Sequence, residues 1–209
     1  RAAWEAKAAA FAPVAASRET PIRPEAVMTT LMDILDDDAI VVADPGTPCP
    51  YFSAHYRWRQ PGRHFITNRA HGALGYSLGA AMGAHVGRPS VKTLAVMGDG
   101  SFGFACGEFE TMVRHKMPIT SIVFSNSVFG WIKAGQDAGF DQRYYNVDFN
   151  RTDHAAVAAA FGVKSWTVKD PEDLPNILKQ AIEHDGPTLV DIHSQQLHDA
   201  AAPVSEWVA

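Results

Sequence analysis

Residues Thr93–Asn126 read TLAVMGDGSFGFACGEFETMVRHKMPITSIVFSN, and this segment indicates the class of fold. Its two ends, Thr93–Gly100 and Ile119–Asn126, are short apolar runs, which predicts two buried strands. Between them, Phe104–His115 predicts a helix. A strand, a helix and a strand in this order indicate two parallel strands with the helix packed on one face of their sheet.

The rest of the chain continues this alternation of apolar runs and helical segments. We therefore expect an α/β fold, a doubly wound and mostly parallel sheet with helices on both faces. Further strands are expected at Ala39–Asp44, His64–Asn68, Val163–Val168 and Thr188–His193, and further helices at Pro24–Leu35, Gly72–Val86, Asp153–Phe161 and Pro171–Glu183. Five phenylalanines are expected in the core: Phe102, Phe104, Phe109, Phe124 and Phe129.

Three parts are expected along the chain. Residues 1–23 form an Ala-rich helix, Arg1–Phe11, and a linker that contains prolines. Residues 24–195 form the α/β domain, and residues 196–209 form a C-terminal tail.

The composition excludes several classes of protein. The 209 residues carry a formal charge of −5, whereas a nucleic-acid-binding domain normally has a basic face. Two cysteines cannot form a disulfide scaffold and suit a reducing compartment, so we expect a cytoplasmic protein. No apolar run is long enough to span a bilayer, so no membrane contact is expected.

Polar residues follow the predicted strands at the sheet edge where parallel α/β folds bind ligands. Gly98-Asp99-Gly100-Ser101 follows one strand, and Asn126 ends the next. Glycines let a ligand approach the backbone, and the start of a helix attracts phosphate. A carboxylate beside a phosphate requires a hard cation such as Mg²⁺ between them, and Asn126 offers a second oxygen ligand. Taken alone, the tetrapeptide is more typical of an ordinary turn after a strand.

The pairing of Gly98-Asp99-Gly100 with Asn126 resembles the thiamine-diphosphate motif, in which Gly-Asp-Gly is followed by a helix, a strand and Asn. The resemblance implies that Asp99, Asn126 and the main-chain carbonyl of Val128 hold Mg²⁺ against the diphosphate. It also implies that Gly98, Gly100 and Ser101 lie against the diphosphate.

Three longer segments extend the resemblance. SNSVFGWIKAGQ (Ser125–Gln136) and HGALGYSLGAAMGA (His71–Ala84) are similar to stretches of acetohydroxyacid synthases, and Thr152–Ile192 is similar to their closing region. The chain is thereby identified as a diphosphate-binding (PP) domain. The enzyme group is that of acetolactate synthase, 2-hydroxyacyl-CoA lyase and oxalyl-CoA decarboxylase.

Further roles follow from this resemblance. The carbonyl of Gly72 accepts a hydrogen bond from the cofactor's aminopyrimidine, Leu74 holds the cofactor bent, and Ile132 lies near the thiazolium. Leu74 and Ile132 are equally compatible with plain core packing. Gly46 and Thr47 stand where the family contacts the diphosphate. His71 is either an acid–base group or a structural residue.

The function implied is a thiamine-diphosphate- and Mg-binding subunit or fragment of an acetolactate synthase-like decarboxylase or carboligase acting on a 2-keto acid. A 2-hydroxyacyl-CoA lyase or an oxalyl-CoA decarboxylase is the alternative, and a non-catalytic scaffold or regulatory subunit is the alternative of another class. In the family a Glu on a separate pyrimidine-binding (PYR) domain activates the cofactor. We therefore expect a PYR-domain partner, or a missing N-terminal part of the same enzyme, in an α2β2 or larger assembly.

Overall fold

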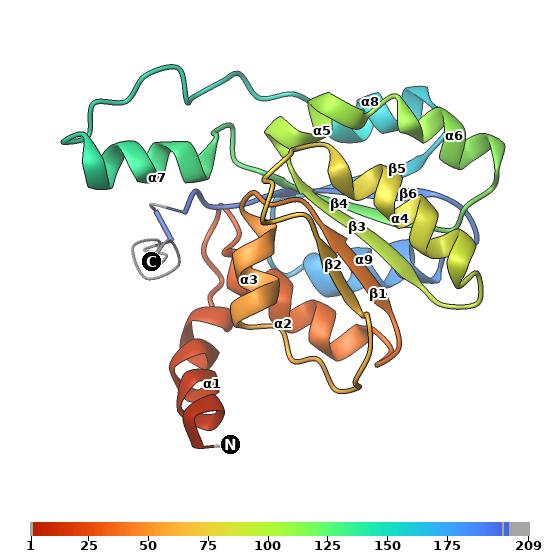
Figure 1. Cartoon of the computed structure of the whole chain (residues 1–209), viewed down its shortest axis with the longest axis horizontal. Helices are drawn as coiled ribbons and strands as arrows, with labels where there is room; N and C mark the ends of the chain where they lie inside the picture. Colours follow the sequence, from red (N-terminus) through yellow and green to blue (C-terminus); the bar gives the residue numbers. More distant parts are fainter. Residues whose placement is uncertain (1, 198, 201–209) are drawn as a thin grey trace.

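The computed structural model describes residues 2–197, 199 and 200, and its described part is built around a parallel sheet (Figure 1). The strand order is β2-β1-β3-β4-β6-β5, and every neighbouring pair is parallel. The expected α/β fold is confirmed. The strands are β1 (Ile40–Ala43), β2 (Phe65–Thr67), β3 (Thr93–Gly98), β4 (Thr120–Ser125), β5 (Lys164–Val168) and β6 (Thr188–His193).

Helices cover both faces of the sheet (Figure 1). One face carries α2 (Pro24–Ile34), α3 (Pro48–Ala54) and α9 (Leu174–Glu183). The other carries α4 (Tyr76–Gly87), α5 (Asp99–Ala105), α6 (Glu108–Arg114) and α8 (His154–Ala160). Helix α1 (Ala2–Ala15) packs beside α2, whereas α7 (Gly130–Gly139) extends away from the sheet.

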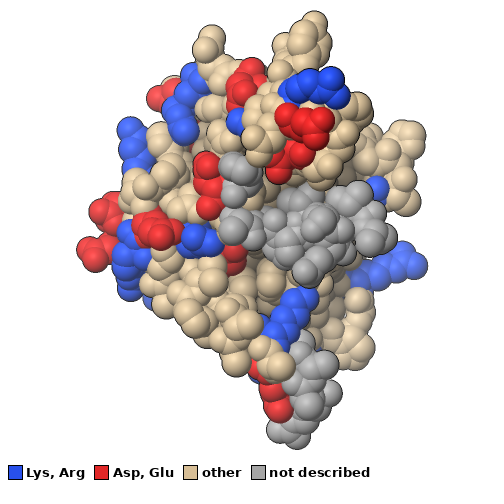
Figure 2. Space-filling view, turned by 90° about the vertical axis from the view of Figure 1, so that its left-hand side faces the viewer, with Lys and Arg blue, Asp and Glu red and all other residues tan. Residues whose placement is uncertain are grey.

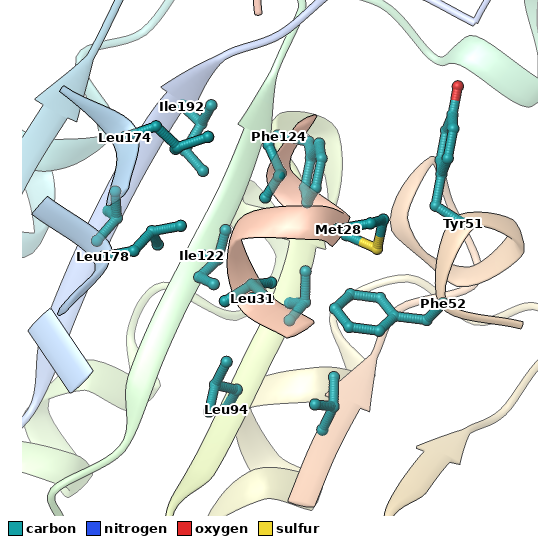
Figure 3. Close-up of a cluster of buried hydrophobic side chains, with 14 of the residues drawn as sticks. Met28, Leu31, Tyr51, Phe52, Leu94, Ile122, Phe124, Leu174, Leu178 and Ile192 are labelled. Atoms are coloured by element: carbon teal, nitrogen blue, oxygen red, sulfur yellow. The ribbon is translucent and has the colours of Figure 1, made fainter. Parts of the chain in front are cut away.

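The two cores follow from the period of a strand, whose successive side chains point to opposite faces. Leu94 and Ile122 point toward α2, where Met28 and Leu31 meet them (Figure 3). Ala95 and Val123, one residue further on, belong to the core beneath α4 and α8. Because both faces are covered, β1, β3 and β4 are buried along nearly their whole length and carry apolar residues on both faces.

The order of the strands creates a switch point between β1 and β3. The chain leaves β1 toward β2 on one side and returns across β1 to β3 on the other. In open parallel sheets, ligands bind at the carboxyl ends of the strands at such a point. This edge therefore brings together the loops that follow β1, β2, β3 and β4.

The structure corrects the expected bounds of three helices. Helix α4 begins at Tyr76 rather than Gly72, because Gly72 and Gly75 have φ of 77° and 80°, which no helix residue adopts. The helix expected at Phe104–His115 is two helices, α5 and α6, and α5 already begins at Asp99. Helix α1 continues to Ala15, beyond its expected end, because the segment is rich in alanine.

Two of the phenylalanines expected in the core lie outside it. Phe129 is partly buried and is not among the core residues, and Phe104 is 70% exposed, whereas Phe102 is buried. Each residue turns a helix by about 100°, so two residues place the rings of Phe102 and Phe104 on nearly opposite sides of α5. Helices α3 and α7 were not expected from the pattern of apolar residues.

No described helix has the length and apolar character needed to cross a lipid bilayer. On the described part of the face in Figure 2, basic and acidic side chains are interspersed rather than gathered by sign.

Candidate functional site

A cavity of about 320 Å³ lies at the carboxyl ends of β1, β3 and β4. This volume is within the range of small-molecule sites. The loops after β1 and β3, the segment before α4 and the first turn of α7 form its walls. Ten residues expected in the site line it: Gly46, Thr47, Gly72, Leu74, Gly98, Asp99, Gly100, Ser101, Val128 and Ile132.

Asp99 connects the end of β3 to the end of β4. Its Oδ2 accepts hydrogen bonds from the main-chain N–H groups of Asn126, at 2.7 Å, and Ser127, at 2.6 Å. Its Oδ1 accepts from the N–H of Gly100, at 2.9 Å. Ser127 has φ of 60°, an uncommon conformation for a residue with a side chain. The buried carboxylate is therefore held by three donors at the floor of the cavity.

The surroundings of Asp99 act on its charge in opposite directions. Burial raises the pKa of the Asp99 carboxyl, and the three N–H donors and His154 oppose this rise. A bound cation would favour the ionised form further, since an ion is the largest local charge in such a site.

One buried polar group near Asp99 lacks a partner and suits a bound ligand. The side-chain nitrogen of Asn126 makes no hydrogen bond within the described structure, whereas the hydroxyl of Ser101 interacts with the Asp44 carboxyl. Buried polar groups normally have a partner, and a 180° rotation of an amide exchanges its nitrogen and oxygen. The donor set, a carboxylate, an amide and a hydroxyl, therefore fits Mg²⁺ and a diphosphate.

Glycines keep the floor of the cavity open. A Cβ at Gly98 would meet no atom within 4 Å, whereas one at Gly100 would lie 2.5 Å from Cε1 of Phe129. A Cβ at Gly130 would lie 3.3 Å from Oγ1 of Thr47. Gly130 therefore allows the start of α7 to approach the loop that follows β1.

Asp44 fixes the segment that carries Leu74. It follows β1, and its Oδ1 accepts from the N–H groups of Tyr76, at 2.8 Å, and Ser77, at 2.9 Å. It thereby satisfies two free donors at the start of α4. Burial raises the pKa of the Asp44 carboxyl, and these main-chain donors together with the hydroxyls of Ser101 and Ser77 oppose the rise. Asn68 holds the other end of the segment, because its side-chain nitrogen donates to the carbonyl of Ala73 at 3.0 Å.

The comparison with known families agrees with this geometry. Residues 45–192 match the thiamine pyrophosphate enzyme, C-terminal TPP binding domain, where TPP is thiamine pyrophosphate, another name for thiamine diphosphate. The chain belongs to this family. The expected resemblance is thus confirmed, and the cavity lies within the matched segment of the TPP binding domain.

Curated relatives are similar over most of this chain. A probable acetolactate synthase large subunit from Methanococcus aeolicus is 29% identical over 185 residues, which is 86% of this chain and 31% of that protein. An acetolactate synthase from Bacillus subtilis (strain 168) is 32% identical over 169 residues, 81% of this chain and 29% of that protein. The mitochondrial acetolactate synthase catalytic subunit from Saccharomyces cerevisiae is 30% identical over 203 residues, which is 94% of this chain and 29% of that protein. The chain therefore spans about 30% of the length of these relatives.

Two residues expected in the site of this TPP binding domain do not line the cavity. Asn126 is buried behind it and contacts Asp99 through its main chain. His71 is exposed and lies outside the lining. Ile132 lines the mouth and is 54% exposed, so it is not a buried helix residue.

Five residues line the cavity without having been expected there. These five residues share no motif. Three of them lie at the start of α7, within the segment Ser125–Gln136 that resembles acetohydroxyacid synthases. That resemblance is the sequence feature from which their place in the site could have been predicted. Arg69 follows β2, and its guanidinium lies 4.9 Å from the ring centroid of Trp131. The five are Pro45, Arg69, Phe129, Gly130 and Trp131.

Proposed function

We propose that this chain binds Mg²⁺ and thiamine diphosphate as part of a decarboxylase or carboligase that acts on a 2-keto acid. The observation that carries the proposal is the buried Asp99 carboxylate, held by three N–H groups beside the cavity. The printed names of the relatives, acetolactate synthases, support the choice of reaction.

Each proposed role uses an atom near the cavity. Asp99, the Asn126 side chain and the main-chain carbonyl of Val128 hold Mg²⁺, and the loop glycines allow the diphosphate to approach. The diphosphate then lies against Gly46, Thr47, Gly98, Gly100 and Ser101, all of which line the cavity.

The remaining residues orient the cofactor and exclude water. The carbonyl of Gly72 accepts a hydrogen bond from the aminopyrimidine, and Leu74 supplies the apolar bulk that bends the cofactor. Ile132 covers the mouth of the cavity. Bound thiamine diphosphate supplies the carbon nucleophile that adds to the substrate carbonyl and accepts the electron pair left by carbon dioxide.

A PYR domain, on a partner subunit or elsewhere in the same enzyme, is proposed to complete the site in an α2β2 or larger assembly. Support comes from Ile132, which lines the cavity and is 54% exposed, since an apolar side chain exposed beside a ligand site suits coverage by another domain. The chain spans only about 30% of the length of its relatives, which also supports a further domain in the complete enzyme.

Calorimetry with thiamine diphosphate and Mg²⁺ tests the proposal, using this chain together with a PYR-bearing partner. Asp99→Ala is expected to abolish binding, because the diphosphate loses the cation that balances its charge. Asp170→Ala is the matched control. Asp170 accepts from the N–H of Glu172 at 2.9 Å in the turn before α9, so its loss removes a carboxylate that accepts from the main chain without touching the cavity.

Two results would contradict the proposal: unchanged affinity in Asp99→Ala, or binding that needs no divalent cation. Turnover of a 2-keto acid is expected only when the partner is present. Turnover by this chain alone would contradict the proposed partner.

A further inference from the structure

A buried polar cluster lies behind the proposed metal site. Its members are Ser125, at the end of β4, His154, at the start of α8, and Asp191, in β6. Their side chains are buried, with residue exposures of 0%, 3% and 1%. Nδ1 of His154 lies 3.2 Å from Oδ2 of Asp191 and 3.5 Å from Oγ of Ser125.

Hydrolytic chemistry does not explain this cluster, although its residue types are those of a Ser-His-Asp triad. A nucleophilic Ser must be reached by its substrate, and Ser125 is fully buried. The hydroxyl is also 3.5 Å from the imidazole and accepts from Nη1 of Arg151 at 3.4 Å, so it is only weakly held by His154.

His154 contacts both chain segments that carry the proposed metal ligands. Ser125 directly precedes Asn126 in the chain. On the other side, the ring of Phe102 meets the imidazole edge to face, with centroids 4.9 Å apart and planes at 77°. Phe102 lies in α5, three residues after Asp99.

Asp191 fixes the place of His154. A buried carboxylate requires a partner, and Oδ1 of Asp191 makes no hydrogen bond within the described structure. Oδ2 contacts the imidazole, so moving His154 away would leave the carboxylate without this partner. The imidazole is therefore held on β6 while it touches β4 and α5.

We propose that His154, held by Asp191, is a positioning residue for the metal site. It keeps the end of β4 and the start of α5 at the separation that lets the N–H groups of Asn126 and Ser127 converge on Asp99. Its effect on metal affinity rests on the proposed function, whereas its effect on the loop geometry does not.

Amide hydrogen exchange on the chain without ligands tests the loop geometry. In His154→Leu the protection of the Asn126 and Ser127 amides is expected to fall about tenfold, which corresponds to weakening their hydrogen bonds to Asp99 by about the net strength of one hydrogen bond. Thr188→Val is the matched control, because Thr188 donates to Oγ1 of Thr120 at 3.1 Å at the opposite ends of the same two strands.

The control is expected to lower the melting temperature without reducing protection at Asn126 and Ser127. Unchanged protection in His154→Leu would overturn the proposal. So would an equal loss in Thr188→Val, because the effect would then be one of general stability.

A double variant, His154→Leu with Asp191→Leu, removes the unpaired carboxylate and carries the test if the single variant does not fold. It is expected to regain stability but not the protection of Asn126 and Ser127, and recovery of both would overturn the proposal.

Calorimetry with Mg²⁺ and thiamine diphosphate then measures the consequence. The dissociation constant is expected to rise about tenfold to hundredfold in His154→Leu and to stay unchanged in Thr188→Val. If the unaltered complex binds neither ligand, the proposed function fails while the exchange result stands. If it binds both and His154→Leu binds equally well, the positioning role fails.

Discussion

Replacing Asp99 by alanine is expected to destabilise the chain even without metal or cofactor. The carboxylate accepts from the N–H groups of Asn126 and Ser127, which arrive from β4, and from that of Gly100 in α5. Alanine leaves these three donors without their acceptor. The change therefore weakens the contact between the ends of β3 and β4 as well as the proposed metal site.

The size of the effect follows from the two donors at the end of β4. A buried donor left without a partner costs about 1–3 kcal/mol, so the donors of Asn126 and Ser127 cost about 2–6 kcal/mol together. Part of this is offset, because burial penalises the charged carboxylate, as its raised pKa indicates. We expect a net loss of about 3 kcal/mol from the free energy of unfolding, within a total of about 5–15 kcal/mol.

Thermal unfolding of the ligand-free chain measures this loss. For a chain of this size, 1 kcal/mol lowers the melting temperature by about 2–4 °C, so Asp99→Ala is expected to melt about 6–12 °C lower. Asp99→Asn keeps one acceptor oxygen and is expected to lose about half as much. Equal melting temperatures for the unaltered chain and Asp99→Ala would refute the reasoning, because the hydrogen bonds of Asp99 would then contribute nothing to the fold.

Gly100→Ala is expected to weaken binding of Mg²⁺ and thiamine diphosphate in calorimetry, because its Cβ would displace the ring of Phe129. Gly103→Ala is the control, because Gly103 lies in the same helix with open space around it, and this change is expected to leave binding unchanged. Burial raises the pKa of Asp44 above its unfolded value, so its contribution to stability is complete at low pH and is lost as the pH rises through the folded pKa. In urea unfolding at about pH 4 and pH 7, the stability of the unaltered chain relative to Asp44→Asn is therefore expected to fall with rising pH, and a constant difference would contradict the raised pKa. Burial lowers the pKa of His55 to about 4, and the ring of Phe11 in α1 stacks on its imidazole. Removal of α1 is therefore expected to raise the pKa of His55 toward 6.5 in an NMR titration. An unchanged pKa would contradict the packing of α1 against His55.

Much of the candidate site was accessible from the sequence because strand ends in a parallel sheet share one edge. Gly98-Asp99-Gly100 and Asn126 end successive apolar runs, so their meeting at one edge follows once the strands are parallel. The hydrogen bonds of Asp99 were not accessible in this way. These hydrogen bonds depend on the left-handed backbone of Ser127, and serine is not a residue type that predicts this conformation.

The sequence by itself determined the class of fold and the location of the cavity. Both rest on local patterns: short apolar runs, helical segments between them, and glycines and a carboxylate directly after a strand. The start of α4 was decided by the left-handed backbone of Gly72 and Gly75. The exposure of Phe104 was decided by which face of the short helix α5 meets the sheet.

Tertiary structure alone also decided which buried carboxylates have partners. Asp44 caps a helix 32 residues away in the sequence, Asp99 binds an N–H 27 residues away, and Asp191 holds an imidazole 37 residues away. No periodic pattern links residues at such separations. The contacts form because the sheet brings the strand ends together, and a buried charge there must find a partner.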